Sequence, residues 1–190
     1  MPDQRDHPTI LETLQSLIQV LPEPHSSYCL IGALALGAWG QVRATQDIDV
    51  LILFEDDELI KLEDQLHPLG FTRDTEWSEA NPLLREQMVR FRHAAYPLDL
   101  LSARDAHDRE VLHRRREISL GEFSVWVCSP EDLILLKLKI GRPRDFEDAM
   151  SVVQLQGANL DMDYVWGWAD RLGLHGELQY VLNSASPPQS

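Results

Sequence analysis

The chain has 190 residues, of which 44% are hydrophobic, and its formal net charge at pH 7 is −14. This length is enough for one domain with a sizeable core, with or without a helical appendage. The negative charge argues against a general nucleic-acid-binding protein, because such proteins contact phosphate through basic surfaces. No apolar run is long enough for a membrane span and no charged-then-apolar leader opens the chain, so we expect a cytoplasmic protein.

The N-terminal segment is predicted to be a disordered leader followed by a helix. Residues 1–8 form the leader, and Thr9 and Glu12 have the spacing of a capping box at the start of a helix. Pro22 is expected to end that helix, because proline has no backbone N–H to donate.

A glycine separates the next two predicted elements. Residues 28–31 have the pattern of a short strand and residues 33–39 that of a helix of small residues, with Gly32 at the junction. Glycine suits a tight turn or a close backbone approach because it lacks Cβ. A strand, a glycine and a helix N-terminus together make a phosphate cradle, although such a glycine is more often only a turn.

Two carboxylates, Asp47 and Asp49, open the apolar run Val50–Phe54, which is typical of a buried strand. Side chains alternate along a strand, so both carboxylates face the same side, about 6.6 Å apart along the backbone. Such charges repel each other unless a cation lies between them, and a hard divalent ion such as Mg²⁺ is the expected cation. The simpler interpretation is a solvated strand edge or a cap.

The rest of the chain predicts alternating strands and helices, and then helices alone. A helix over residues 57–69 ends at Gly70, and a helix beginning at Ser129-Pro130 opens a helical region. Further strands are predicted over residues 71–77, 87–94, 97–102 and 117–127, the last as a hairpin through Gly121-Glu122. The fold class is therefore α/β (α+β), with a mixed sheet flanked by helices. The expected division is an α/β core over 9–128, a helical region over 129–183 and a disordered tail over 184–190.

The glycine turn and the carboxylate pair together resemble the first motif of the polymerase-beta-like nucleotidyltransferases. In that family an apolar residue, Gly and then Gly or Ser precede an Asp-x-Asp or Asp-x-Glu pair, as Ile31-Gly32-Ala33 precedes Asp47-Ile48-Asp49. Arg43-Ala44-Thr45-Gln46 is similar to the Arg-x-Thr-x of the minimal AbiEii-like or MNT-like branch found in bacterial toxin–antitoxin systems. Ala33 departs from the pattern, so only backbone N–H donors remain there for a triphosphate.

The resemblance continues in the segment 136–148, which looks like the Leu-Lys, Gly-Arg and Asp-x-x-Asp block that closes the nucleotidyltransferase unit. It implies transfer of a nucleoside monophosphate from an NTP to a hydroxyl, with Mg²⁺ or Mn²⁺ held by Asp47, Asp49 and Asp99. Asp99 would complete a second metal or act as the base. Lys137 would reach the triphosphate, and Asp145 would orient the lysine or lie near the acceptor. The implied nucleotide-binding residues are Gly32, Ala33, Arg43, Thr45, Lys137 and Arg142.

The later residues also have simpler interpretations. Asp99 is equally a strand-edge acid facing water. Lys137 and Lys139 lie two positions apart on the predicted helix, so they do not share a face and at least one is expected to be solvated. Only the alignment favours Lys137. Asp145 is alternatively an N-cap, and Arg142 alternatively pairs with nearby acids.

Basic residues gather in one part of the chain. Residues 85–144 hold twelve of the seventeen Lys and Arg against nine acids, most densely over 104–116. One interpretation is a helix with a solvated basic face, salt-bridged to Asp105, Asp108 and Glu110. The other is a patch that binds RNA, such as a tRNA end, or an acidic partner protein.

Three functions follow. The leading one is a metal-dependent nucleotidyltransferase with an RNA or tRNA acceptor, toxin-like in its role. The same chemistry on a small antibiotic is the first alternative. The second is a non-catalytic interaction module, an antitoxin or adaptor, for which Ala33 is the main hint and the retained carboxylates a counterargument. A cognate partner protein and a homodimer both remain open.

Overall fold

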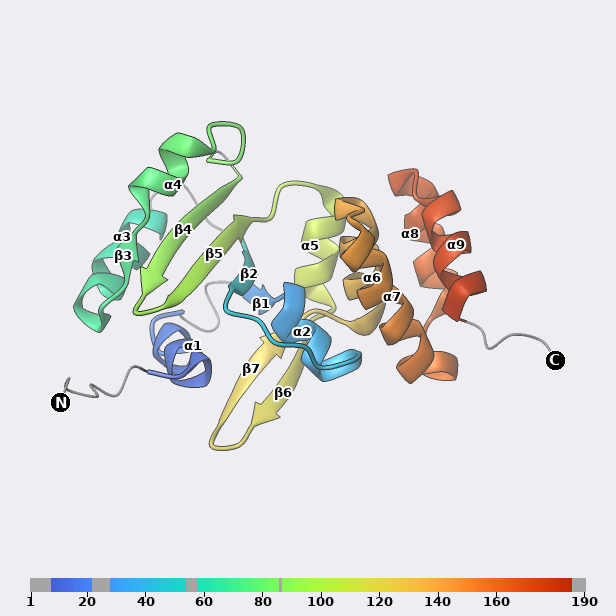
Figure 1. Cartoon of the computed structure of the whole chain (residues 1–190), viewed down its shortest axis with the longest axis horizontal. Helices are drawn as coiled ribbons and strands as arrows, with labels where there is room; N and C mark the ends of the chain where they lie inside the picture. The colour runs from blue at the N-terminus through green and yellow to red at the C-terminus, as the bar shows by residue number, and fades with distance from the viewer. Residues whose placement is uncertain (1–7, 22–27, 54–57, 86, 186–190) are drawn as a thin grey trace.

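The computed structural model describes residues 8–21, 28–53, 58–85 and 87–185. At its centre lies a seven-stranded mixed sheet with the strand order β3-β4-β5-β2-β1-β7-β6, flanked by helices (Figure 1). This architecture confirms the predicted fold class. Residues 1–7 of the predicted leader and residues 186–190 of the predicted tail lie outside the described residues.

The first elements begin close to where the sequence predicts them. Helix α1 (Ile10–Ile18) opens with the expected capping box, in which the backbone N–H of Glu12 donates to Thr9 Oγ1 at 3.2 Å. Strand β1 (Tyr28–Leu30) and helix α2 (Gly32–Trp39) follow. Strand β2 (Ile48–Ile52) begins earlier than predicted, so Asp49 lies inside the strand rather than before it. Phe54, the predicted end of this strand, is outside the described residues.

The segment after β2 confirms one prediction and corrects another. Helix α3 (Glu58–Leu66) and the 3₁₀ turn η1 (His67–Leu69) end at Gly70, whose left-handed φ of 89° supports the predicted stop. The strand predicted over 71–77 is wrong beyond residue 73, because β3 (Thr72–Arg73) gives way to helix α4 (Thr75–Ala80). Asp74 starts that helix by accepting a hydrogen bond from the backbone N–H of Trp77 at 2.9 Å.

The remaining strands complete the sheet around β2. Strands β4 (Met88–His93) and β5 (Tyr96–Ser102) form an antiparallel pair, and β5 runs parallel to β2. Helix α5 (Ala106–His113) leads to β6 (Arg116–Leu120) and β7 (Phe123–Val127), the predicted hairpin. Strand β1 joins the two halves, since it pairs with β2 on one side and β7 on the other.

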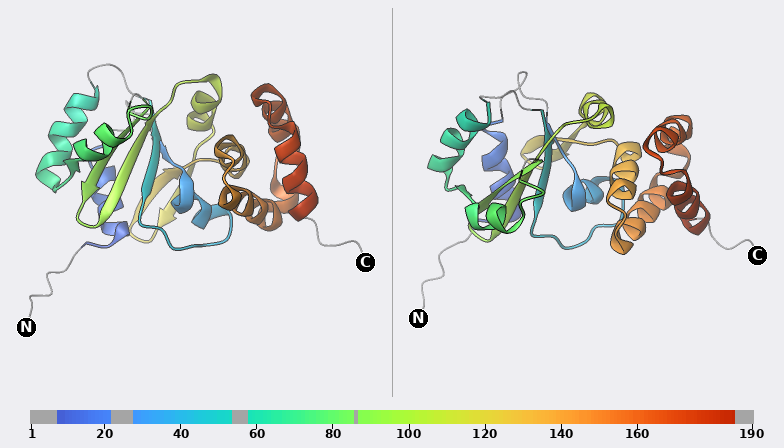
Figure 2. Two further views of the ribbon diagram at one scale, coloured as in Figure 1. Left: turned by 45° about the horizontal axis from the view of Figure 1, so that its top comes forward. Right: turned by 90° about the horizontal axis from the view of Figure 1, so that it is seen from above.

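Helices occupy the C-terminal part of the chain, as predicted. They are α6 (Pro130–Ile140), α7 (Pro143–Gln156), the 3₁₀ turn η2 (Gly157–Asn159), α8 (Met162–Leu172) and α9 (His175–Ala185). They gather at one side of the molecule, opposite α3 and α4 (Figures 1 and 2). Helix α9 extends through residue 185, so the predicted tail does not begin at 184. None of the helices in the described part of the chain has the length and apolar content to cross a membrane.

Both cysteines are core residues. Cys29 in β1 and Cys128 after β7 are free thiols and fully buried. Burial raises the pKa of both thiols, because it disfavours the charged thiolate. They therefore act as small apolar side chains that pack the centre of the sheet.

Candidate active site

One cleft, of about 660 Å³, brings together the residues that the sequence singled out. Strand β2, the start of α2, the ends of β5 and α6 and the start of α7 all contribute to its wall. Ten predicted site residues line it: Gly32, Ala33, Arg43, Thr45, Asp47, Asp49, Asp99, Lys137, Arg142 and Asp145. Segments more than a hundred positions apart therefore meet at one place.

The contact between the glycine turn and the first carboxylates is direct. Gly32 has φ +64°, and a Cβ added to it would lie 2.0 Å from Asp49 Oδ2. The backbone N–H of Ile31 donates to the carbonyl of Asp49 at 3.0 Å, which fixes the turn against β2. A side chain at position 32 would therefore be both strained and in collision with the carboxylate.

Asp49 lacks a cationic partner among the described residues, where its carboxylate makes no hydrogen bond or ion pair. Its pKa is raised to about 6, first by burial and then by the neighbouring carboxylates of Asp99 and Asp47. Lys137 and Arg142 oppose this rise with their positive charge. An excess of negative charge borne by carboxylate oxygens fits a hard divalent cation.

Asp47 is exposed at the mouth of the same strand, and its backbone is held in place by Thr45. Thr45 Oγ1 accepts a hydrogen bond from the N–H of Asp47 at 3.2 Å and donates to its carbonyl at 3.3 Å. The hydroxyl of Thr45 thus shapes the turn that presents the carboxylate.

Asp99 is buried, so its interpretation as a strand-edge acid facing water is wrong. Its two carboxylate oxygens accept hydrogen bonds from Arg90 Nε and Nη2, each at 2.6 Å. The guanidinium of Arg90 also lies 4.6 Å from the centre of the Trp77 ring. Sequence reasoning missed Arg90, because its partner depends on the exact register of the β4–β5 hairpin, which places it opposite Asp99.

A ladder of alternating charges holds the buried Lys137. Its Nζ donates to Asp148 Oδ2 at 2.6 Å and to Asp145 Oδ1 at 3.3 Å. Asp148 also binds Arg43 Nη2 at 3.2 Å, and Asp145 binds Arg142 Nε at 2.7 Å. Asp148 received no role from the sequence, although the Asp-x-x-Asp spacing contains it. The ladder fixes the ammonium of Lys137 at the wall of the cleft.

Asp145 does more than cap a helix. The N-cap of α7 is Arg142, and Asp145 lies three residues later, where its Oδ2 accepts a hydrogen bond from the backbone N–H of Arg142 at 3.2 Å. The alternative prediction, in which Asp145 is the N-cap, is therefore wrong, because the N-cap lies three residues earlier. The same carboxylate closes the first turn of α7 and binds Lys137.

Lys139 also lines the cleft, as an exposed lysine paired with two carboxylates. Its Nζ lies 3.0 Å from Asp105 Oδ2 and 3.0 Å from Asp108 Oδ1. Lys139 is exposed, as expected of at least one of the two lysines, although its ammonium is paired with these two carboxylates. The cleft wraps around the C-terminal end of α6, so both lysines reach it.

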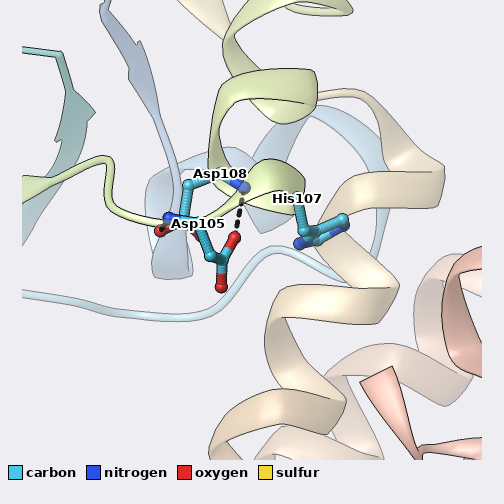
Figure 3. Close-up of side chains that lie close together, drawn as sticks. All are labelled: Asp105, His107 and Asp108. Carbon is cyan, nitrogen blue, oxygen red and sulfur yellow. Dashed lines mark hydrogen bonds between the residues drawn. The ribbon is translucent and has the colours of Figure 1, made fainter. Parts of the chain in front are cut away.

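Within the described ranges, one group of three potential metal ligands has its ligand atoms within 4.8 Å of one another: Asp105, His107 and Asp108. Figure 3 shows the Asp105 carboxylate accepting the backbone N–H of Asp108, which caps α5 at 2.8 Å. Lys139 already supplies a cation to both carboxylates. The buried ring of His107 lies 3.5 Å from a carboxylate oxygen of Asp132. This group is therefore a helix cap whose carboxylates are bound to a lysine.

The basic segment divides between several environments. Arg114 lies 3.7 Å from the centre of the Tyr164 ring and 3.4 Å from a Glu131 oxygen, and Arg116 also approaches Glu131, at 3.5 Å. The predicted salt bridges to Asp105 and Asp108 are therefore wrong, since these two carboxylates bind Lys139. Of the basic residues in the segment, Arg104 alone lines the cleft in the part that the structure describes.

Solved structures share this fold at low sequence identity. The antibiotic-resistance factor ANT(2″)-Ia, in complex with adenylyl-2″-tobramycin, matches with a TM-score of 0.58 and 17% identity over 84% of this chain and 96% of its own. The lincomycin-bound lincosamide antibiotic adenylyltransferase LnuA matches with 0.52 and 14% over 73% and 93%. An antigenic nucleotidyltransferase-like protein from Paracoccidioides brasiliensis matches with 0.55 and 17% over 90% and 91%.

These structural similarities establish the fold, and a family model establishes the family to which the chain belongs. No curated protein sequence matches the chain. The model described as "Nucleotidyltransferase of unknown function (DUF6036)" matches residues 9–167, which include every residue of the cleft. The chain therefore belongs to the DUF6036 family within the nucleotidyltransferase superfamily.

Proposed function

We propose that the protein is a divalent-metal-dependent nucleotidyltransferase, which transfers a nucleoside monophosphate from an NTP to a hydroxyl and releases pyrophosphate. The observation that carries the proposal is the contact of Gly32 with Asp49. It puts a helix N-terminus, which binds phosphate, against a carboxylate that has no cationic partner among the described residues. A phosphate-bound metal ion would find its ligands at this junction.

Each group in the cleft has a role in this proposal. Asp47 and Asp49 would hold Mg²⁺ or Mn²⁺ through their carboxylate oxygens. When bound, the ion supplies positive charge to the transferring phosphoryl group. The backbone N–H groups of Gly32 and Ala33 bind the triphosphate, and the absence of a hydroxyl at Ala33 leaves this contact entirely to the backbone.

The charge ladder serves the leaving pyrophosphate. Lys137 is fixed by Asp145 and Asp148, so its ammonium needs little reorganisation when negative charge develops on the phosphates. Arg43 and Arg142, at the two ends of the ladder, add positive charge beside it. Asp145 and Asp148 are positioning residues, since they act through Lys137.

The charge of the cleft supports an anionic acceptor such as the end of an RNA. Seven basic and five acidic side chains line it. Arg104 and Arg144 are exposed, and their guanidinium groups make no hydrogen bond or ion pair within the described parts of the chain. The likeness to ANT(2″)-Ia and LnuA favours the second candidate, a small antibiotic acceptor. A toxin-like role of the AbiEii or MNT kind belongs to the RNA proposal, through the resemblance at Arg43–Gln46.

Thermal melting with each of the four NTPs, with and without Mg²⁺, tests the nucleotide site, because a ligand bound only by the native state raises stability. We expect a Mg²⁺-dependent rise with at least one NTP, lost in D47N/D49N. Transfer of label from that NTP to total RNA, tobramycin or lincomycin then identifies the acceptor class. A chain that melts identically under all conditions would instead be the non-catalytic interaction module.

A further inference from the structure

Three charged residues form a row across adjacent strands of the sheet. In the register of the sheet, Arg90 of β4 is opposite Asp99 of β5, and Asp99 is opposite Asp49 of β2. Residues opposite one another on neighbouring strands project from the same face. The order of charges along this row is therefore positive, negative, negative.

Arg90 forms an ion pair with Asp99 that engages both oxygens of the carboxylate. Both oxygens of Asp99 accept hydrogen bonds at 2.6 Å, in the two-point geometry of a guanidinium and a carboxylate. The side chain of Arg90 is only 19% exposed and that of Asp99 only 7%. The Trp77 ring, from α4, covers the guanidinium on one face at 4.6 Å. The guanidinium of Arg90 is therefore fixed by the Asp99 carboxylate and the Trp77 ring together.

Asp49 differs in this respect, since its carboxylate has no ion pair among the described residues. Asp47, Asp49 and Asp99 also do not gather into one ligand set: in the described ranges, the single group of three ligands within 4.8 Å lies at Asp105. The cleft therefore offers one pair of carboxylates that lacks a cation and one carboxylate that already has one.

We propose that Arg90 takes the place of a second divalent cation at Asp99, so that the site binds one metal ion, at Asp47 and Asp49. The inference rests on the proposed function and specifies its metal requirement. A second ion at Asp99 would have to displace a bidentate, stacked guanidinium, and one divalent ion with one arginine already offsets the three carboxylates. Arg90 is a positioning residue, because it acts through Asp99.

Titration with Mn²⁺ alone, followed by electron paramagnetic resonance, tests this stoichiometry without relying on activity. We expect wild type to bind one more Mn²⁺ per chain than D47N/D49N, which corrects for ions on the acidic surface. In R90Q the freed Asp99 carboxylate becomes a ligand. R90Q should therefore bind two more Mn²⁺ per chain than D47N/D49N does. Adding D99N to R90Q should return this difference to one ion.

The double variant R90Q/D99N is also the control for folding. It replaces a buried ion pair by a neutral pair that keeps hydrogen-bonding groups, so it avoids the unpaired buried carboxylate that R90Q leaves behind. If Asp99 is a metal ligand in wild type, this variant binds fewer ions than wild type, and the inference is overturned. The inference is also overturned if R90Q folds and still binds only one more ion than D47N/D49N.

These outcomes separate the two proposals. If D47N/D49N binds as many ions as wild type, the metal site of the proposed function is wrong. If D47N/D49N removes two ions from wild type, the metal-dependent function stands and only the substitution of Arg90 for a second ion is wrong.

Discussion

The main chain of Gly32 and the carboxylate of Asp49 occupy adjoining space, with no room for a Cβ atom between them. The Cβ position of residue 32 lies 2.0 Å from Asp49 Oδ2, and the φ of +64° is one that side chains rarely adopt. Both constraints select glycine, one through the local backbone and the other through a residue seventeen positions later. The turn therefore fixes the position of the carboxylate as well as the start of α2.

We expect G32A to abolish nucleotidyl transfer and to lower the free energy of unfolding by about 1–2 kcal/mol from the left-handed φ alone. The collision with Oδ2 adds to this cost by moving Asp49. The control is G37A in the same helix, where nothing lies within 4 Å of the added Cβ. Alanine at position 37 should stabilise the helix by up to about 1 kcal/mol. Urea unfolding of both variants measures the difference, and equal effects would contradict the packing argument.

Asp49 should lower the free energy of unfolding of the metal-free protein, although nucleotidyl transfer requires it. Its pKa in the folded protein is raised to about 6 from 3.8, so the folded state binds the proton more tightly than the unfolded state does. The contribution of Asp49 to stability without metal is therefore most favourable below pH 4, falls as the pH rises towards 6, and stays lower above it. At pH 7, D49N should be more stable than wild type by up to about 3 kcal/mol and inactive in transfer.

The pH profile of thermal unfolding measures this effect, with D49N as the reference. Saturating Mg²⁺ should flatten the wild-type profile between pH 4 and 6, because the ion stabilises the ionised carboxylate. A wild-type profile that matches D49N without metal would show that Asp49 ionises without cost.

The two lysines of α6 should differ sharply in their contribution to stability. K137M removes the buried ammonium that Asp145 and Asp148 share, although Arg142 and Arg43 remain as their partners, so we expect a cost of about 1.5–3 kcal/mol. K139M removes a partly exposed pair with Asp105 and Asp108, worth about 1 kcal/mol or less. Chemical denaturation of the two variants compares them, and similar losses would mean that the charge ladder is not the main support of the cleft.

The sequence predicted those parts of the cleft that depend on residues close together in the chain. The turn at Gly32 and the carboxylates at Asp47 and Asp49 each depend on a few neighbouring residues, so the sequence alone indicates them. Arg90 and Asp148 act through partners on other elements, and no local pattern reveals those partners. Their roles follow from strand register and from the packing of α6 on α7.

The errors in secondary structure have a similar cause. The strand predicted beyond Arg73 is wrong because Asp74 starts a helix there, and the same carboxylate also binds Arg92 Nε at 2.6 Å. Asp105 and Asp108 were assigned to neighbouring arginines, whereas they bind Lys139 of α6. Sequence proximity favoured the wrong partners because tertiary packing brought better ones.

The two exposed arginines of the cleft should affect the acceptor more than the nucleotide. R104Q/R144Q removes two positive charges that have no partner among the described residues. With a single-stranded RNA acceptor, we expect the slope of log affinity against log salt concentration to weaken by about 1.4, since each phosphate contact contributes about 0.7. The rise in Tm with NTP and Mg²⁺ should stay close to that of wild type. The matched control is R109Q, because Arg109 is exposed on α5 but lines a different hollow. Filter binding over a salt series makes the comparison, and an R109Q protein with the same loss of slope would mean that the cleft does not select the acceptor by charge.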